Sequence, residues 1–387
     1  MHVAQLIYTY DRDLTDPDAL LDRYATLTGW GDALAAAGVE RVTAMVAFTR
    51  DAIVRRGQVR YHFVRTAPVR PQALAHGRLH RVLATLGPDL LHVNGLSFPV
   101  ETWLLRRTFP ETPIVLQDHA NRFPRHPARR ALGRVGLRAA NGFLFAAAPL
   151  AEPWRAAGLI GADQPVFEVM ESSTRFEPIG RCRARAMTGL LGQPALLWVG
   201  RLDVNKDPLT VLAGFERALP RLGDAHLTML FHTEELRADV ERHIAGSRQL
   251  SGRVHLRGQV AHERLATFHS AADLFVLGSH HEGSGYALLE AMACGAVPVV
   301  TDIPSFRVIT GGGAVGALWP CGNAGALATA LVRCADTGLR AASRQVRRRF
   351  ARQLSWPTVG RQALRIYQIV ASGSPVSLSD PPARVGG

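Results

Sequence analysis

The sequence predicts an α/β protein built from two doubly wound parallel sheets. The chain has 387 residues, of which 47 % are hydrophobic, and this length exceeds what one ordinary core accommodates. Predicted strands and helices alternate along both halves, as in sheets with helices on both faces. We therefore expect an N-terminal Rossmann-like domain over 1–170 and a C-terminal one over 171–356.

In the N-terminal half, polar side chains stand at the ends of two predicted strands. His92 and Asn94 belong to one strand, and Asp118 and His119 close the other. Doubly wound sheets bind ligands beyond the carboxyl ends of their strands, so these four residues are candidate site residues. Apolar runs predict strands at 2–8, 42–48, 61–64, 90–95, 113–119, 143–145 and 166–169, and helical periodicity covers 20–38, 73–86 and 102–107.

The periodicity weakens over 171–193, which predicts the connection between the domains, and a second alternating series follows. Strands are expected at 196–199, 225–231, 254–256, 272–278 and 297–301, and helices at 208–219, 234–244, 263–271, 288–293, 324–335, 342–354 and 357–371. The tail over 372–387 is rich in Ser, Pro and Gly and is predicted to be disordered.

The charge of the chain points to acidic partners. The formal net charge is +13, and 44 of the 45 basic residues are arginine. Four cysteines without metal or disulfide spacing fit a reducing compartment. The sequence shows neither a signal peptide nor the run of about 18 apolar residues that a membrane-spanning helix needs. A cytoplasmic protein, with peripheral contact at the inner face of a membrane as an option, is the expectation; no nucleic-acid-binding motif is present.

The segment 122–138 is strongly basic and leaves two interpretations open. One is an ordinary surface helix with a solvated face, and the other is a patch for an anionic membrane or an acidic acceptor. Its arginines are Arg122, Arg125, Arg129, Arg130, Arg134 and Arg138, with Leu132, Val135 and Leu137 between them.

Two loops of the C-terminal half carry the clearest chemistry. Arg201 and Lys206, the only lysine of the chain, lie where a strand end meets a helix start, and such a pair of cations suits a diphosphate. About 80 residues on, Glu282 precedes a glycine-rich turn into a helix that carries Glu290. A helix N-terminus beside glycines is suited to anions. His280 and His281 are consecutive in this loop and lack the spacing of a metal site.

Together these segments resemble the retaining GT-B glycosyltransferases of family 4, also called group 1. Three stretches carry the resemblance: Gly200-Arg201-Leu202 with Lys206, the strand at 271–277, and Glu282-Gly-x-Gly-x4-Glu290-Ala-Met-Ala-Cys-Gly-x-x-Pro-Val-Val. It covers about 196–331 continuously, and it is looser at the strand ends of His92 and His119.

The resemblance implies a role for each matched residue. Arg201 and Lys206 would hold the donor diphosphate together with the backbone around Ser284, Gly285 and Tyr286. Glu282 would act at the donor sugar, and Glu290 would bind the ribose. His119 would face the reaction from the N-terminal domain, with Asp118, His92 and Asn94 toward the acceptor. The family usually has an aromatic residue where this chain has Ser284.

The implied fold is GT-B, with the two domains facing a cleft and the helix at 357–371 returning to the N-terminal domain. The implied activity is metal-independent, retaining hexosyl transfer without a cofactor from a UDP-, GDP- or ADP-sugar to a glycan, lipid-linked or small-molecule acceptor in polysaccharide biosynthesis. Two alternatives stay open. One is a nucleotide-sugar 2-epimerase of the same fold, and the other is a catalytically silent nucleotide-sugar-binding scaffold.

Overall fold

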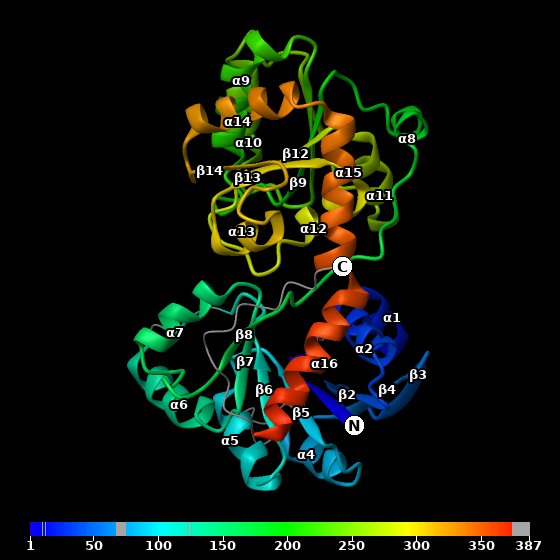
Figure 1. Ribbon diagram of the computed structural model, residues 1–387, viewed down its shortest axis with the longest axis vertical. Helices are drawn as coiled ribbons and strands as arrows, with labels where there is room; N and C mark the ends of the chain where they lie inside the picture. The colour runs from blue at the N-terminus through cyan, green and yellow to red at the C-terminus, as the bar shows by residue number, and fades with distance from the viewer. Residues whose placement is uncertain (10, 12, 67–74, 122, 125, 374–387) are drawn as a thin grey trace. The chain divides into compact units, whose positions relative to one another are not determined.

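The computed structural model describes residues 1–373 except 10, 12, 67–74, 122 and 125 (Figure 1). The described chain forms two compact units. The described residues of 1–172 and 356–373 form unit 1, and Ser173–Ser355 forms unit 2. The predicted disorder of 374–387, like the predictions for Arg122, Arg125 and the first two residues of the helix at 73–86, lies outside the described residues.

The sheet of unit 1 has the order β3-β4-β2-β1-β5-β6-β7-β8. All neighbours are parallel except β3 and β4, which are antiparallel. The chain moves outward from β1 in one direction and then in the other, so the topological switch point lies between β1 and β5. The strands are β1 (His2–Ile7), β2 (Arg41–Phe48), β3 (Ala52–Arg56), β4 (Val59–Arg65), β5 (Leu90–Asn94), β6 (Ile114–Gln117), β7 (Gly142–Phe145) and β8 (Val166–Glu168).

Helices cover this sheet, and the last one comes from the far end of the chain. The helices are α1 (Pro17–Arg23), α2 (Ala25–Ala36), α4 (Gly77–Ala84), α5 (Pro99–Thr108), α6 (Pro127–Leu137), α7 (Glu152–Ala156) and α16 (Trp356–Ser372). In Figure 1, α16 runs beside α2. Their backbones approach so closely that a Cβ at Gly360 would overlap the carbonyl oxygen of Ala33. The predicted return of this helix to the N-terminal sheet is confirmed.

The sheet of unit 2 is wholly parallel, with the order β11-β10-β9-β12-β13-β14. Its switch point lies between β9 and β12. The strands are β9 (Ala195–Gly200), β10 (His226–Phe231), β11 (Val254–Gly258), β12 (Leu274–Leu277), β13 (Val297–Thr301) and β14 (Ala317–Trp319). The two predicted nucleotide loops follow β9 and β12, the two strands that flank this switch point.

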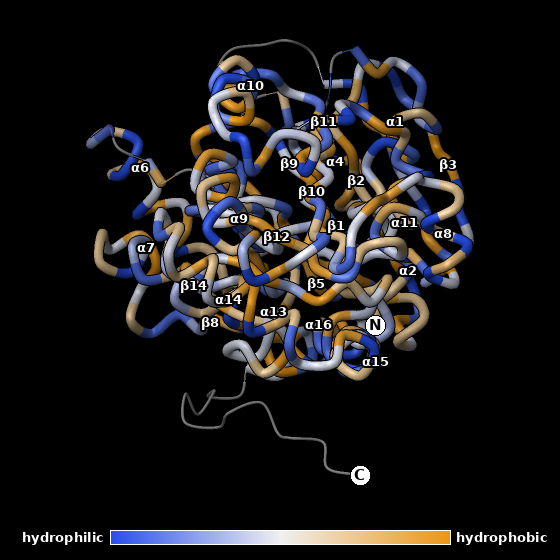
Figure 2. The backbone as a smooth tube through the Cα atoms, turned by 90° about the horizontal axis from the view of Figure 1, so that it is seen from above, coloured by the Kyte–Doolittle hydropathy of each residue, from blue (hydrophilic) through white to orange (hydrophobic). Residues whose placement is uncertain are grey.

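The helices of unit 2 mostly occupy the predicted positions. They are α8 (Arg181–Thr188), α9 (Pro208–Leu222), α10 (Arg237–Ala245), α11 (His262–Ala271), α12 (Tyr286–Cys294), α13 (Pro304–Thr310), α14 (Ala324–Asp336) and α15 (Leu339–Arg349). Buried strand residues form much of the core of each unit, and Figure 2 shows hydrophobic segments alternating with hydrophilic ones along the chain. Two doubly wound sheets confirm the predicted fold class.

Several local predictions were wrong. The helix expected at 20–38 is divided at Tyr24, whose φ of −103° and ψ of 65° are not helical. The short strands β3 and β14 were missed, and β3 makes the first sheet mixed instead of parallel. The expected irregular connection contains α8, which ends at Gly189 with a left-handed φ of 65°.

Candidate active site

The loop after β9 is built to start a helix at a defined place. Asp207 adopts a left-handed conformation (φ 44°), and its Oδ1 accepts a hydrogen bond from the Thr210 amide at 3.2 Å, which caps α9. Pro208 follows at the first helical position, where its missing amide hydrogen costs nothing. This geometry brings Lys206 to the carboxyl edge of the sheet, with a side chain that is only 14 % exposed.

The loop after β12 packs directly on the loop after β9. A Cβ at Gly278 would lie 3.1 Å from the carbonyl oxygens of both Lys206 and Asp207, so the close approach favours glycine. Asn205 joins the loops with its side chain: its Oδ1 accepts from the His281 amide at 3.1 Å, and its Nδ2 donates to the His281 carbonyl at 3.1 Å. Close packing at Gly278 and the hydrogen bonds of Asn205 therefore hold the two predicted nucleotide loops together.

Lys206 and Glu282 meet at the junction of these loops. The ammonium of Lys206 donates to the carboxylate of Glu282, and both side chains are 14 % exposed. Arg201 is more open, with a side chain that is 52 % exposed and an Nε that lies 3.1 Å from Asp203 Oδ2. Two cations thus stand at the switch point, one partly buried and one accessible. A phosphate that reached Lys206 would compete with Glu282 for the ammonium.

The turn into α12 depends on a glycine. Gly285 has a left-handed φ of 59°, and a Cβ there would overlap the ring of Phe306. Ser284 before it is buried, whereas Tyr286 at the start of α12 is 45 % exposed. The N-terminus of α12, together with the residues predicted to bind the donor, therefore follows directly after Glu282.

Glu290 lies inside α12 and points to two histidines of α11. His262 Nε2 is 3.0 Å from Glu290 Oε1, and His269 Nε2 is 3.7 Å from Oε2. Burial pushes the pKa of Glu290 upward, but the imidazoles of His262 and His269 outweigh it and hold the pKa below its usual value. Sequence reasoning missed both histidines, although their spacing of seven on one helix was a readable signal.

A polar cluster occupies the carboxyl edge of β5 and β6 in unit 1. His119 Nε2 lies 3.2 Å from Asn94 Oδ1, and its Nδ1 lies 3.1 Å from Glu171 Oε2. The imidazole is therefore held from both sides while its side chain stays 31 % exposed. Glu171 is buried and comes from the segment after β8 that sequence reasoning treated as a connection. The structure brings His119 and Asn94 into contact, with Asp118 next to His119 in the chain.

Asp118 is the unusual acid of this cluster. Burial, with a further contribution from the nearby charge of Glu171, raises its pKa to about 6. The backbone amides of Asn121 and Ala120 and the His119 side chain lower the pKa, but by less. Asp118 Oδ1 accepts from the Asn121 amide at 3.0 Å, and Asn121 Oδ1 in turn accepts from the amides of Leu96 (2.9 Å) and His119 (3.2 Å). This network fixes the loop that carries His119.

The structure corrects the prediction for His92. Its ring is fully buried, and its Nδ1 lies 2.6 Å from the hydroxyl of Tyr367, which also accepts a hydrogen bond from Trp30 Nε1 at 3.1 Å. Burial lowers the pKa of His92 to about 3, so the ring is neutral. His92 points to the face of the strand covered by α16 and α2 and takes part in the core instead of the site.

Within the basic segment, Pro127–Leu137 forms α6, which exposes apolar side chains next to arginines. Gly133, Gly136 and Leu137 form its buried face. Leu132 and Val135 are 47 % and 60 % exposed. Arg129, Arg134 and Arg138 are also exposed. Within the described part of the chain, no helix is long and apolar enough to cross a bilayer, and no three His, Cys, Asp or Glu side chains are grouped to hold a metal ion.

Comparison with known proteins agrees with this geometry. Residues 193–337 match the family described as "Glycosyl transferases group 1". The chain is 28 % identical over 317 residues to a GDP-mannose:cellobiosyl-diphosphopolyprenol alpha-mannosyltransferase of Xanthomonas campestris, covering 78 % of this chain and 70 % of the relative. It is also 28 % identical to a phosphatidyl-myo-inositol mannosyltransferase of Mycobacterium leprae, with 79 % and 80 % covered.

Solved structures share the fold along nearly the whole chain. A sucrose-phosphate synthase of Thermosynechococcus elongatus superposes with a TM-score of 0.71 at 21 % identity, over 97 % of this chain and 100 % of that one. Anabaena HepE in complex with UDP and glucose gives a TM-score of 0.67 at 15 % identity, over 95 % and 99 %. The family match covers the strands and loops that hold Arg201, Lys206, Glu282 and Glu290, and with these relatives it supports a group 1 glycosyltransferase, while the solved structures show the GT-B fold.

Proposed function

We propose that this glycosyltransferase moves a mannosyl residue, with retention of configuration and without a metal ion, from GDP-mannose to a lipid-linked acceptor. The choice of donor and acceptor rests on the names of two relatives, which are a GDP-mannose-dependent polyprenol-linked and a phosphatidylinositol mannosyltransferase. The single observation that carries the chemistry is the contact of Lys206 with Glu282 at the switch point of unit 2.

In the proposed reaction the bond between the anomeric carbon and the diphosphate oxygen breaks. The oxygen of an acceptor hydroxyl bonds to that carbon, and its proton passes to the departing diphosphate oxygen. Negative charge grows on the departing diphosphate, and Arg201, Lys206 and the N-terminus of α12 supply fixed positive charge and dipole toward it. This is the role that a metal ion has in other enzymes. Glu282 would then turn from Lys206 to the donor sugar, and Glu290 would hold the ribose.

Replacement of the two cations should separate binding from chemistry. Arg201→Ala and Lys206→Ala are each expected to weaken GDP binding about tenfold or more, because each removes a charged hydrogen-bond donor. Glu282→Gln is expected to keep GDP binding, since it frees Lys206, and to abolish mannosyl transfer. Calorimetry with GDP, together with product analysis from GDP-mannose and a polyprenol-linked or phosphatidylinositol acceptor, measures both.

Arg221→Ala at the other end of α9 is the matched control, because Arg221 is exposed and remote from the loop. Full activity of Glu282→Gln would sink the site assignment. Release of an epimerised sugar would instead support a 2-epimerase, and binding without turnover in the wild-type enzyme would support a silent binding protein. NMR of the product's anomeric proton decides between retention and inversion.

We also infer that α6 carries the enzyme to an anionic membrane, where a lipid acceptor resides. The support is the exposure of Leu132 and Val135 between exposed arginines. Apolar side chains flanked by guanidinium groups suit the boundary between acyl chains and anionic headgroups.

A further inference from the structure

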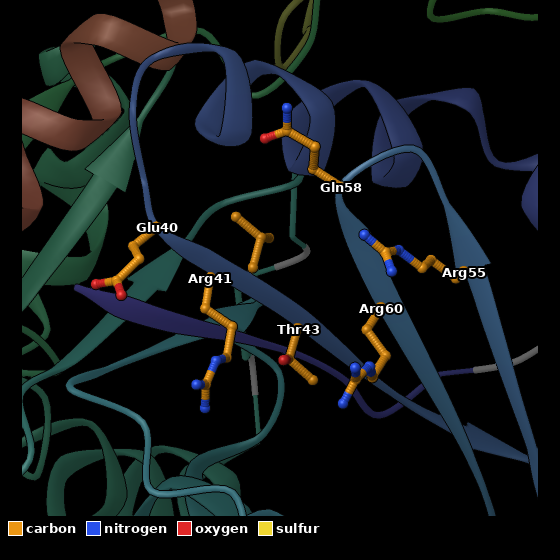
Figure 3. A pocket seen from close by; sticks show the side chains of 7 residues that line it. Glu40, Arg41, Thr43, Arg55, Gln58 and Arg60 are labelled. Carbon is orange, nitrogen blue, oxygen red and sulfur yellow. The ribbon is translucent and has the colours of Figure 1, made fainter.

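We propose that unit 1 holds a second anion site, a pocket that binds a phosphate or diphosphate group at the amino-terminal edge of its sheet. The pocket has a volume of about 340 Å³ (Figure 3). Its lining residues are Glu40, Arg41, Val42, Thr43, Arg55, Gln58 and Arg60. They come from the starts of β2 and β4, the end of β3 and the turn between β3 and β4, so the site is formed by four adjoining chain segments.

Strand register places the three arginines on one face. Thr43 of β2 pairs with Arg60 of β4, and Arg60 pairs with Arg55 of β3. The side chains of Thr43, Arg60 and Arg55 are therefore cross-strand neighbours on one face. Arg41 is two residues before Thr43 and shares its face. In Figure 3, Arg41, Thr43 and Arg60 extend toward the same side of the sheet. Like charges directly opposite one another destabilise a sheet, and an anion between them removes that cost.

The described residues leave these arginines without carboxylate partners. Among the described residues, no ion pair reaches Arg41, Arg55 or Arg60, and Arg55 Nε donates to the carbonyl of Gly57 at 3.3 Å. The acid of the lining is Glu40, whose Oε2 lies 3.3 Å from the amino group of Met1. By contrast, the adjacent Arg56 of β3 pairs with Asp18 at 2.7 Å. The pocket therefore keeps an excess of positive charge.

The floor of the pocket is polar. Thr43 is buried, and its Oγ1 lies 2.9 Å from Nε2 of the buried His2. On the same face His62 is also buried, and its Nε2 lacks a hydrogen-bond partner within the described chain. Burial first, and then the charges of Arg60 and His2, lower the pKa of His62. Hydroxyl, amide and guanidinium donors together suit a phosphate, which guanidinium groups bind with two hydrogen bonds each.

The pocket is separate from the polar cluster of His119. Arg41 opens β2, while Asn94 and His119 follow the opposite, carboxyl ends of neighbouring strands. Strands of this length span roughly 20 Å. The volume lies at the small end of the range for ligand pockets, which fits a phosphate or diphosphate that bears a small group. Such a group can belong to a soluble phosphoester or to a lipid headgroup.

The test is the binding of inorganic pyrophosphate to the full chain at low ionic strength. The double variant Arg41→Ala/Arg60→Ala is expected to lower the affinity of this site at least about tenfold, because two charged donors are lost. The matched control is Arg23→Ala, which removes an exposed arginine of unit 1 outside the pocket. Thermal unfolding of each variant checks that the sheet stays folded.

Pyrophosphate also suits the proposed donor site, so the measurement is repeated in an Arg201→Ala/Lys206→Ala background, in which the pocket is intact. Persistence of binding there, and its loss on adding Arg41→Ala/Arg60→Ala, supports the pocket. Complete loss in that background, or binding there that the added Arg41→Ala/Arg60→Ala leaves unchanged, overturns it. Flotation with phosphatidate vesicles, compared between Arg41→Ala/Arg60→Ala and Arg23→Ala, distinguishes a lipid headgroup from a soluble phosphoester as the ligand. A selective fall in flotation assigns a lipid headgroup, and equal flotation assigns a soluble phosphoester.

Discussion

Several side chains of this protein contact partners that are remote in sequence. Lys206 and Glu282 are 76 residues apart, yet each is the partner of the other. The two roles proposed for these residues, one at the diphosphate and one at the sugar, would therefore be linked, because a ligand that binds one residue must release it from the other. His119 depends in the same way on Asn94 and on the distant Glu171.

Asp118 gives a prediction about pH. Its pKa is raised from the ordinary 3.8 to about 6, so the native state holds a proton that the unfolded state has lost. The free energy of unfolding contributed by this group therefore falls as the pH rises from about 4 to about 6, by roughly 2 kcal/mol. Asp118→Asn should abolish that fall, because an amide does not titrate.

Hydrogen exchange of the β6 amides between pH 4 and pH 7 measures this effect in unit 1 alone. The stability of Asp118→Asn relative to the wild type should grow steadily across this range. Asp163→Asn, which changes an exposed carboxylate of the same unit, serves as the control and should show little trend. Parallel curves for Asp118→Asn and the wild type would contradict the raised pKa.

Secondary-structure elements show the same dependence on distant contacts. Helix α8 has little apolar periodicity, and it is held by its arginines: Arg181 Nη1 and Arg185 Nη2 reach the two oxygens of Asp273 at 2.7 and 2.6 Å. Asp273 is buried at the start of β12 and also accepts from the Ala195 amide at 2.9 Å. An ion pair that spans about 90 residues thus attaches the helix to the sheet, and local sequence contains no sign of it.

The contact of α16 with α2 is sensitive to one methyl group. Gly360→Ala should cost about 3 kcal/mol, because the added Cβ overlaps the backbone oxygen of Ala33 and the two helices must separate. Gly77→Ala is the matched control: Gly77 begins α4, a Cβ there meets no atom of the described residues within 4 Å, and alanine favours helix by about 1 kcal/mol.

Thermal unfolding of both variants tests the contact. We expect a lower midpoint for Gly360→Ala and an equal or higher one for Gly77→Ala. If Gly360→Ala melted with the wild type, α16 would not be docked as closely as the structure has it.

At the scale of the whole molecule, charge is the leading feature. The net charge of +13 attracts the chain to any anionic surface, and on α6 exposed apolar side chains accompany this charge. Charge alone gives binding that salt removes, whereas inserted side chains add binding that salt does not screen.

Vesicle flotation distinguishes these contributions. With anionic vesicles at moderate salt, Leu132→Ser/Val135→Ser should reduce the bound fraction about fivefold, because two apolar side chains no longer enter the bilayer. Met187→Ser, which replaces another exposed apolar residue, on α8, should bind as the wild type does. Equal binding by all three proteins would leave α6 an ordinary solvated helix.

Much of the fold was predictable because its signals are local. Buried parallel strands are continuous apolar runs, and caps such as Asp207-Pro208 mark helix starts. The loops of Arg201 and Glu282 were found because glycines and charged residues follow directly after such strands. The missed elements lack these signals: β3 is a short edge strand with alternating exposure, and α8 depends on Asp273.

By itself, the sequence determined the two doubly wound sheets, the loops that flank the second switch point and the residues those loops present. Only the tertiary structure decided which side chains meet. In the folded chain Lys206 contacts Glu282, Glu171 contacts His119, and His92 lies in the core beside Tyr367. Strand and helix patterns arise from neighbours a few residues apart, whereas these contacts depend on strand order and on the return of α16. A residue's chemistry can be read from its type, but its partner is set by the packing of distant segments.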